Sequence, residues 1–568
     1  MIGLISATAA GAAARDRLAV AWPDRTRVYE GPVADAVRRA FGECEQLVCF
    51  LATGAVVRLV APLLSDKASD PGVVCVDEGG RFAVSLVGGH GGGANELARA
   101  VGTLLGAEPV VTTATDAMGV PGLDTLGMPV EGDVAGVSRA LLDGEPVALE
   151  AESIWPLPAF PSNVGGAAAG AGAVIRVTDR AVDPAGHEVV LRPPSLVVGV
   201  GASKGAPVDE VLGLVKGALA DAGLSVASVA ALATVDAKAG EPGIVGAAER
   251  LGVPLVTYSA EELAVVDVPN PSDAPLAAVG TPSVAEAAAL VGGGELLVPK
   301  TKSQRADGAP AMATCAVVRR PGRGRLAVVG LGPGARDLLT PRAEAELRRA
   351  SVLVGLDQYV DQIRDLLRPG TRVLESGLGA EEERARTAVA EARKGQAVAL
   401  IGSGDAGVYA MASPALAEAS DDIDVVGVPG VTAALAAAAI LGAPLGHDHV
   451  SISLSDLHTP WEVIERRVRA AAEADIVVTF YNPRSRGRDW QLPKALAILG
   501  EHREPTTPVG VVRNASRSDE AGRVTTLAAL DPATVDMMTV VTVGNTATRN
   551  IAGRMVTPRG YRWQESAR

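Results

Sequence analysis

The sequence is poor in aromatic residues and in cysteine. Aromatic residues make up 3% of its 568 residues, whereas 48% are hydrophobic, so we expect cores built from valine, leucine and alanine. The four cysteines form neither a CxxC pair nor a Cys/His zinc spacing, which argues against a metal site. So few unpaired cysteines in a long chain fit a reducing cytoplasm, where we expect the protein.

Positive charge is also in short supply. The chain has 52 Lys and Arg residues against 66 Asp and Glu residues, which leaves a net charge of −14. Such an acidic chain is a poor candidate for binding nucleic acid through a basic face, and no polybasic tract indicates a membrane surface. The longest apolar stretch, 431–445, is too short to span a bilayer. We therefore expect small-molecule partners, and neither nucleic acid nor a membrane.

The chain does contain a regular alternation of β-type runs with helical runs rich in Ala, Leu, Glu and Arg. Examples of the β-type runs are LVCFLA, LVVGVGA, LAVVGLG, AVALIGSG and IVVTFYN. This rhythm predicts βαβ units and mainly parallel sheets, and hence a multidomain α/β protein. Open sheets of this kind bind ligands at the carboxyl ends of their strands, so we expect the chemistry there.

Three breaks divide the chain. Residues 126–194 are rich in Pro and Gly, a new strand begins at Ser195, and the charged segment RRPGRGR at 319–325 is typical of a linker. The predicted domains are 1–125, 126–194 (a middle domain or insertion), 195–318 and 325–568.

Two glycine-rich turns stand at strand ends in the C-terminal part. The first, GLGPG at 330–334, contains Pro333, which lacks the N–H that a phosphate cradle would use. This turn either needs small residues for its shape or lines a ligand. The second, GSGD, carries Gly404 and Asp405 to a strand tip, where a flat ligand can approach the backbone. Further along, Thr432 begins a helix of small residues, which it either caps or helps to bind a ligand.

Two later segments are rich in polar residues. The segment HDHVSISLSDLHTP at 447–460 groups histidines with aspartates but has no HxxxH or HExxH spacing, which disfavours a zinc site. The strand VVTFYN then leads into a loop that carries Arg484, Arg486 and Arg488. This loop is either a solvated basic surface or a clamp for several carboxylates, which arginine binds well through paired hydrogen bonds.

In order and spacing these motifs closely resemble the tetrapyrrole methyltransferase family. Within it, SLSDLHTPWEVIERR, YNPRSRGRDWQLPKA, TPVGVVRNASR and VDMMTVVTVGN look like the precorrin-3B C-17 methyltransferases, and the resemblance covers essentially all of 325–560. It implies two α/β subdomains with S-adenosylmethionine in the cleft between them, and a homodimer. It also implies methylation at C-17 with contraction of the macrocycle, so that cobalt would enter only as part of the substrate.

The resemblance also implies which residues bind the ligands. The expected contacts of S-adenosylmethionine are Gly404, Asp405, Val408, Tyr409, Thr432, Ala433, Phe480, Tyr481, Asn482, Gly544, Asn545 and Thr546. The tetrapyrrole is expected to meet Gly332, Pro333, Gly334, Arg484, Arg486, Arg488 and Arg513. One departure is Ala406, where the family usually has Pro, which leaves the conformation of this turn open.

Ring contraction requires a ring hydroxyl to lose its proton as carbon migrates, so a general base is needed. The candidates are Asp448, Asp456 and His458, each of which is otherwise a strand-end cap. Methyl transfer from a sulfonium consumes a positive charge, so alignment and desolvation are expected to do most of the catalysis.

The N-terminal part has its own polar strand ends. His90 lies in the glycine run GGHGGGANEL, and the strand end TTATD carries Asp116. The imidazole is either a ligand or base site or a turn histidine without chemistry. Residues 50–116 resemble the amino-terminal domain of cobalt-precorrin-5A hydrolase, and 195–290 resembles its carboxyl domain. This resemblance implies an α/β hydrolase-like unit of two or three small domains that opens a lactone and releases acetaldehyde.

Water attack on a lactone needs a base and an oxyanion partner. The candidates are His90, Asp116, Lys238 and Glu241, of which the last two could equally form a surface ion pair. Three alternatives stay open. The N-terminal half could bind and deliver an intermediate without hydrolysing it, and the C-terminal part could methylate another ring carbon. The whole chain could instead be a nucleotide-dependent oxidoreductase, against which Pro333 argues.

Overall fold

The computed structural model places the chain in two compact units, and each is described by itself. The described residues are 1–66, 69–152, 154–166, 171–272, 276, 280–304, 308–485 and 487–560. The N-terminal unit comprises Met1–Trp155, Phe160–Gly322 and Arg368–Gly370, and the C-terminal unit comprises Pro156–Ala159, Arg323–Leu367 and Thr371–Arg568. The boundaries predicted at 125, 194 and 318 stay predictions.

The first sheet of the N-terminal unit has the strand order β2-β1-β3-β4-β5-β6, in which β5 and β6 run against the other strands. Its strands are β1 Ile2–Ser6, β2 Thr26–Val28, β3 Gln46–Phe50, β4 Gly72–Val76, β5 Phe82–Val87 and β6 Glu108–Val110. Its helices are α1 Ala9–Ala21, α2 Val33–Glu43, α3 Thr53–Val60 and α4 Ala94–Leu105. Alternate strand residues pack against α1 and α4 on one face and against α2 and α3 on the other, so this is a doubly covered sheet.

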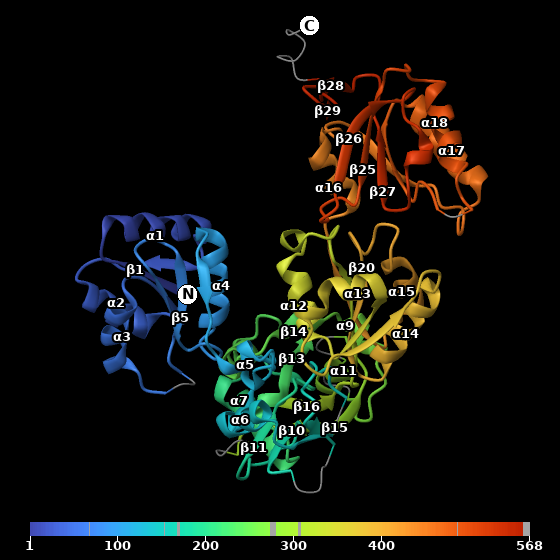
Figure 1. Cartoon of the computed structure of the whole chain (residues 1–568). Coiled ribbons are helices and arrows are strands. Elements are labelled where there is room, and N and C mark those ends of the chain that lie inside the picture. The colour runs from blue at the N-terminus through green and yellow to red at the C-terminus, as the bar shows by residue number, and fades with distance from the viewer. Residues whose placement is uncertain are drawn as a thin grey trace. The chain divides into compact units, whose positions relative to one another are not determined.

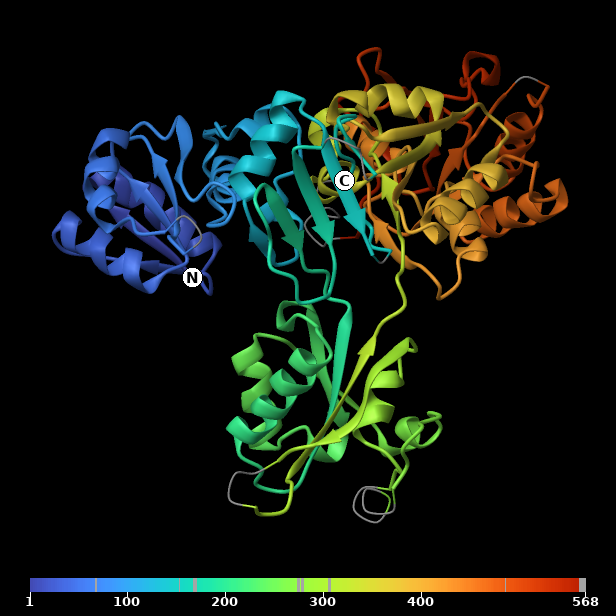
Figure 2. The same ribbon diagram turned by 90° about the horizontal axis from the view of Figure 1, so that it is seen from below.

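The other two sheets of this unit follow along the chain. One, of order β7-β11-β10-β8-β9, contains β7 Val130–Gly132, β8 Val147–Ala151, β9 Val164–Gly165, β10 Ala173–Val177 and β11 Glu188–Leu191 with helix α6 Val134–Asp143. Between the first sheet and this one lie the short helices α5 Ala114–Ala117 and η2 Leu123–Thr125. The other, of order β14-β13-β12-β16-β15, contains β12 Leu196–Ala202, β13 Val229–Val235, β14 Leu255–Tyr258, β15 Glu295–Lys302 and β16 Ala313–Arg319. Its helices, α7 Val208–Asp221, α8 Pro242–Leu251, α9 Ala260–Ala264 and α11 Ala285–Leu290, lie on both faces (Figure 2).

The C-terminal unit begins with a parallel sheet of order β19-β18-β20-β17-β21. Its strands are β17 Arg325–Gly330, β18 Val352–Leu356, β19 Arg372–Ser376, β20 Ala397–Gly402 and β21 Asp424–Val428. Its helices are α12 Pro341–Arg349, α13 Asp357–Ile363, α14 Glu381–Arg393 and α15 Ala412–Glu418. Helices α14 and α15 cover one face and α12 and α13 the other, so the carboxyl ends of all five strands meet at one edge.

The second sheet of this unit, of order β23-β24-β27-β25-β26, is mixed, because β27 runs against both of its neighbours. Its strands are β23 His449–Ser453, β24 Val477–Tyr481, β25 Pro508–Arg513, β26 Ala521–Thr526 and β27 Thr539–Val543. Helices α17 Trp461–Glu473 and α18 Gln491–Gly500 pack on one face and α16 Ala433–Leu441 on the other (Figure 1). The strands β22 Gly442–Ala443, β28 Arg549–Ile551 and β29 Arg554–Val556 form a small third sheet.

This architecture confirms the predicted multidomain α/β class with a C-terminal part of two subdomains. The apolar stretch 431–445 is divided between α16 and the short strand β22. Among the residues that the structure describes, no helix is long and apolar enough to cross a membrane.

Close packing of a strand against a helix fixes one glycine in the third N-terminal sheet. A Cβ atom on Gly199 of β12 would lie 1.8 Å from the carbonyl oxygen of Ala285 at the start of α11. We expect Gly199→Ala to lower the free energy of unfolding by about 1–3 kcal/mol, because the helix would have to move off the sheet. Urea unfolding measures this loss. Gly213→Ala on the exposed face of α7, where a Cβ meets nothing within 4 Å, is the control. An equal loss in both variants would contradict the close approach.

Candidate active site

The two glycine-rich turns of the C-terminal unit are joined by backbone hydrogen bonds. The N–H of Gly332 donates to the carbonyl of Gly404 over 3.0 Å, and the N–H of Gly404 donates to the carbonyl of Gly332 over 2.7 Å. Both residues have positive φ, +75° and +68°, which favours glycine. The predicted ligand loops at the tips of β17 and β20 therefore form one continuous wall.

Asp405 ties a third strand tip to this wall. One carboxylate oxygen accepts from the N–H of Gly407 over 2.8 Å, and the other accepts from the N–H of Gly430 over 3.0 Å. A Cβ on Gly430 would lie 2.1 Å from the carbonyl oxygen of Gly404, so this position also requires glycine. Ala406 is buried beside Asp405. Asp405 thus shapes the backbone of the site before any ligand is considered.

Tyrosines link the two subdomains across the site. The hydroxyl of Tyr481 at the end of β24 shares a hydrogen bond of 2.5 Å with Thr432 and accepts another from the N–H of Ala434 over 2.8 Å. The hydroxyl of Tyr409 donates to the carbonyl of Ser451 over 2.7 Å, and the rings of Tyr409 and Tyr481 lie 5.3 Å apart. Burial raises the pKa of both tyrosines, so both hydroxyls stay protonated at neutral pH. Thr432 and Ala433, predicted on α16, therefore adjoin Tyr481.

The residues around these tips fit a nucleoside-like methyl donor. Tyr409, Asn482 and Asn514 all have positive φ, although they are not glycines, and such strain gathers at binding sites. The buried side-chain oxygen of Asn514 accepts no hydrogen bond from the described residues, so it is free to accept one from a ligand. Gly404 is buried and Val408 is partly buried, and the polar groups beside them could hold the sugar, base and amino-acid parts of S-adenosylmethionine.

Some predicted contacts lie elsewhere. Because β27 is antiparallel to β24, its carboxyl end carries Gly544, Asn545 and Thr546 to the opposite edge of the sheet from Tyr481. There the N–H of Thr546 donates to Asp475 over 3.0 Å. The expectation that all strand ends share one edge fails for this strand, so the structure does not bring these residues to the tyrosine site.

Two further predicted site residues, Asp448 and Phe480, need correction because of where the structure places their side chains. Asp448 precedes β23, at the edge where that strand begins, and its side chain is 86% exposed. The side chain of Phe480 is fully buried in the core between the second sheet and its helices. Asp448 therefore lies away from the strand tip at Tyr481, and only the backbone of Phe480 could touch a ligand.

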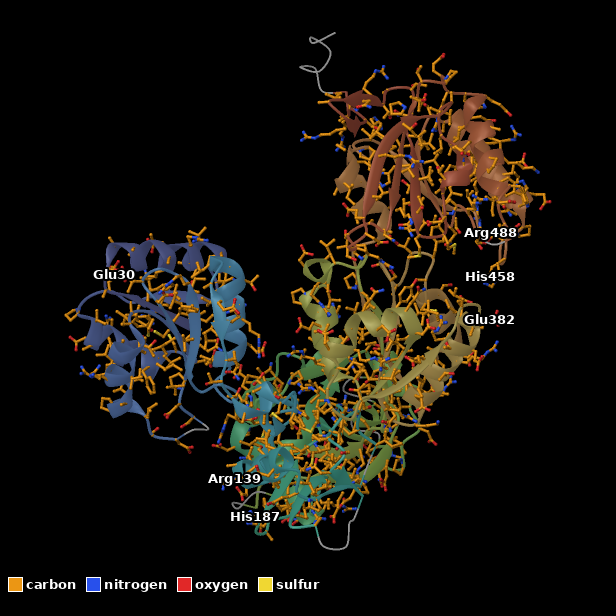
Figure 3. All side chains as sticks on the ribbon, viewed as in Figure 1. Glu30, Arg139, His187, Glu382, His458 and Arg488 are labelled. Carbon is orange, nitrogen blue, oxygen red and sulfur yellow. The ribbon has the colours of Figure 1, made fainter. Side chains whose placement is uncertain are left out.

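The other two candidate bases follow β23 at its carboxyl end. Asp456 accepts a hydrogen bond from the side-chain amide of Gln491 over 2.9 Å and is partly buried. His458 is exposed on the same loop (Figure 3). Since β23 and β24 are parallel, Asp456 lies at the same edge as Tyr481. Of the three candidates, Asp456 is the one held by a neighbour at that edge.

The arginines predicted to clamp carboxylates are bound to the protein itself. Arg484 donates to the carbonyl of Ala533, and Arg488 (Figure 3) donates to the carbonyls of Leu454 and Asn482. Arg513 forms ion pairs with Asp519 and Asp536. Arg486 lies outside the described residues. Arg484 and Arg488 of the loop after β24 are therefore held by carbonyl groups of the protein itself.

Sequence reasoning missed four residues beside the glycine wall: Tyr359, Arg384, Ser403 and Arg517. Arg517, from the loop after β25, donates from Nε to the carbonyl of Pro333 over 3.1 Å. Arg384 of α14 is only 6% exposed. Arg384 stands in no motif that the sequence analysis singled out, whereas Arg517 is the last residue of the segment TPVGVVRNASR and could have been found there. Ser403 lies within the GSGD motif and could have been found there.

In the N-terminal unit the structure brings His90 and Asp116 together. His90 Nε2 lies 2.8 Å from Asp116 Oδ2, and Nδ1 lies 3.2 Å from Asp124 Oδ1. Asp116 also accepts from Asn95 and pairs with Arg99 at 2.7 Å. The hydrogen bonds with Asp116 and then Asp124 raise the pKa of His90 to about 9, and the bond with His90 holds the pKa of Asp116 well below its usual range. His90 is therefore an imidazolium with both N–H groups engaged, and not a free base.

The second predicted pair, Lys238 and Glu241, is also close. Their charged atoms lie 3.8 Å apart at the carboxyl end of β13. Glu241 is buried and accepts a hydrogen bond from the N–H of Gly205 over 2.7 Å. The pair is thus partly buried and ties the tip of β12 to that of β13, rather than lying free on the surface. The described residues contain no group of three or more His, Cys, Asp or Glu that could hold a metal ion.

Comparison with known proteins matches both units. The family model of tetrapyrrole (corrin/porphyrin) methylases matches residues 325–531. The models described as the cobalamin synthesis G N-terminal and C-terminus match residues 35–116 and 196–318.

Individual relatives match part of the chain. A probable cobalt-factor III C(17)-methyltransferase of Salmonella typhimurium is 46% identical over 239 residues, which cover 42% of this chain and 99% of that protein. A precorrin-3B C(17)-methyltransferase of Sinorhizobium is 41% identical, over 42% of this chain and 97% of that protein. The chain spans 45% and 48% of two longer curated relatives. The crystal structure of the methyltransferase CobJ is 40% identical and covers 41% of this chain, with a TM-score of 0.40. The chain belongs to the tetrapyrrole (corrin/porphyrin) methylase family of cobalamin biosynthesis, and it carries both cobalamin synthesis G domains ahead of its methylase part.

Proposed function

We propose that the C-terminal unit transfers a methyl group from S-adenosylmethionine to C-17 of precorrin-3B or its cobalt form, with contraction of the ring. The observation that carries this proposal is the joined wall of Gly332 and Gly404, faced by the Tyr481–Thr432 hydrogen bond, in a segment 46% identical to a C(17)-methyltransferase. Relatives named for precorrin-3B and for cobalt-factor III leave both forms of the substrate open. We further propose that the protein acts as a homodimer in the cytoplasm.

The proposed chemistry assigns tasks to this chain's own residues. The donor, when bound, supplies an electrophilic methyl group on a sulfonium. Gly404 and Gly332 join their turns into one wall for a flat ligand, and Asp405 ties the turn of Gly404 to the tip of β21 through the N–H groups of Gly407 and Gly430. Because the reaction consumes charge, a cleft that excludes water favours it. Asp456 is our candidate to take the proton that ring contraction releases.

We also propose that the N-terminal unit opens the lactone of cobalt-precorrin-5A and releases acetaldehyde. The support is the match to both cobalamin synthesis G domains, together with the polar clusters at His90 and at Lys238. An imidazolium between two carboxylates acts as a proton donor or as an electrostatic partner of an oxyanion, rather than as the base. The engagement of both His90 nitrogens favours a second candidate, a module that binds a tetrapyrrole without hydrolysing it.

The donor site is tested by Tyr481→Phe. The variant leaves the N–H of Ala434 without its acceptor, and Thr432 loses its hydrogen-bond partner. We expect the affinity for S-adenosylhomocysteine, measured by titration calorimetry, to fall roughly 5- to 100-fold, which corresponds to about 1–3 kcal/mol. Tyr258→Phe in the N-terminal unit is the control. Absence of any heat for S-adenosylhomocysteine with the unaltered protein, with or without a precorrin, would overturn the methyltransferase proposal.

The hydrolase proposal is tested by acetaldehyde release from cobalt-precorrin-5A. Asp116→Asn removes the charge that His90 and Arg99 share, and we expect the rate to fall on the order of 100-fold. Asp133→Asn, at an exposed aspartate paired with His187, should keep the rate. If the unaltered protein binds cobalt-precorrin-5A and yields no acetaldehyde, the N-terminal unit is a tetrapyrrole-binding module and not a hydrolase.

His90 also makes stability depend on pH. Its pKa is about 9 in the folded chain against 6.5 in the unfolded one, so its contribution is complete below pH 6.5 and is lost as the pH rises through 9. We expect the difference in free energy of unfolding between the unaltered protein and His90→Gln to shrink by about 3 kcal/mol from pH 6 to pH 9.5. Urea unfolding at both pH values measures it, with His187→Gln as the control. A difference that is the same at both pH values would contradict the ion pairing of His90 with Asp116 and Asp124.

A further inference from the structure

The carboxyl ends of the parallel sheet in the C-terminal unit carry an unusual row of side chains. In strand order, the tip of β19 meets Arg384, the tip of β18 leads into Tyr359, the tip of β20 carries Ser403, and the turn after β17 meets Arg517. Two cations, a phenol and a hydroxyl thus follow one edge of the sheet, beside the glycine wall. None of these residues is needed to explain how the methyl donor is held.

Arg384 is a buried cation whose described partners are all neutral. Its guanidinium donates to Ser376 Oγ over 3.1 Å, to the carbonyl of Gly377 over 2.9 Å and to the sulfur of Met411 over 3.6 Å. It is only 6% exposed, and no carboxylate within the described part of the chain forms an ion pair with it. Burial of a charge without a counter-charge is strongly unfavourable, so an anion that bound here would supply the counter-charge that the described residues lack.

Arg517 brings a second cation to the same edge. It comes from the second subdomain, yet its Nε donates to the carbonyl of Pro333 and its Cγ would lie 2.6 Å from a Cβ on Gly334. The absence of a side chain at Gly334 is what lets this arginine lie flat against the glycine turn. Among the described residues Arg517 too has no carboxylate in ion-pair contact, whereas its neighbour Arg513 has two.

The pKa of Tyr359 is affected by the charges of both arginines. Burial and, more weakly, Glu381 raise the pKa of its hydroxyl, while Arg517, Arg384 and a hydrogen bond with Ser403 each act to lower it. Both guanidinium groups are therefore near enough to favour negative charge at the Tyr359 oxygen. An anion placed at this edge would feel the same attraction, with Tyr359 as a hydrogen-bond donor.

We propose that Arg384 and Arg517 form a receptor for one carboxylate arm of the macrocyclic substrate, with Tyr359 donating a hydrogen bond to the same arm. This proposal rests on the proposed methyltransferase function, and it moves carboxylate recognition from the arginine loop after β24 to the first sheet. The arm fixes the rotation of the macrocycle against the glycine wall, and so determines which ring carbon faces the methyl donor. Arginine suits this task because its planar group binds a carboxylate through two parallel hydrogen bonds.

The test titrates the full chain with uroporphyrin, a macrocycle with eight carboxylates, by fluorescence, and separately with S-adenosylhomocysteine by calorimetry. We expect Arg384→Gln and Arg517→Gln each to weaken uroporphyrin binding roughly ten- to a hundredfold. The matched controls are Arg386→Gln, two residues along α14 and exposed, and Arg523→Gln on β26. Both should bind uroporphyrin within about twofold of the unaltered chain.

The uroporphyrin and S-adenosylhomocysteine titrations distinguish failure of the receptor proposal from failure of the methyltransferase proposal. S-adenosylhomocysteine affinity should stay the same in all four variants, because a purely structural role for the arginines would disturb both ligands together. Should Arg384→Gln fail to fold, the half-exposed Arg517 decides the matter. Unchanged uroporphyrin affinity in Arg517→Gln overturns the receptor, as does a parallel loss of both ligands. Lack of S-adenosylhomocysteine binding by the unaltered chain overturns the methyltransferase proposal, while the uroporphyrin titration still decides the receptor.

Discussion

The C-terminal site depends on the paired hydrogen bonds between Gly332 and Gly404, over 3.0 and 2.7 Å. These bonds join turns from neighbouring parallel strands into one backbone surface, and a side chain at either position would be strained by its positive φ. Asp405 extends the surface to Gly430 by accepting hydrogen bonds from two backbone N–H groups. The geometry of this surface is therefore set by the backbone before a ligand binds.

Charge is distributed unevenly around that surface. Among the arginines away from it, Arg513 pairs with carboxylates and Arg488 donates to backbone carbonyls. Arg384 and Arg517 also meet only neutral groups among the described residues, and what sets them apart is that they lie near the glycine turns. In an acidic chain with a net charge of −14, such local positive charge is what can attract a polyanionic macrocycle, since the field at a site depends mostly on near neighbours.

In the N-terminal unit, charged groups of alternating sign surround His90. His90 lies between Asp116 and Asp124, and Arg99 balances the charge of Asp116 on its other side. Alternating charges in this way stabilises the imidazolium and holds the glycine run around His90 against α5 and η2. The arrangement is well suited to donating a proton or to stabilising negative charge. It is poorly suited to removing a proton from water, which is the role that a neutral histidine would play.

The sequence by itself determined the alternation of strands and helices, the α/β class and the glycine-rich tips at 330–334 and 402–405, because these depend on local periodicity and on backbone freedom. It also indicated His90, Asp116, Thr432 and Tyr481 as separate candidates, since each lies at or after the end of a strand. Only the tertiary structure decided that Gly544–Thr546 lie at the far edge, because the direction of β27 is not encoded in its own residues. The same holds for Arg384, which packs against the site from a helix distant in sequence, and for the contact of Arg517 with Pro333, because contacts between distant segments leave no local pattern to read.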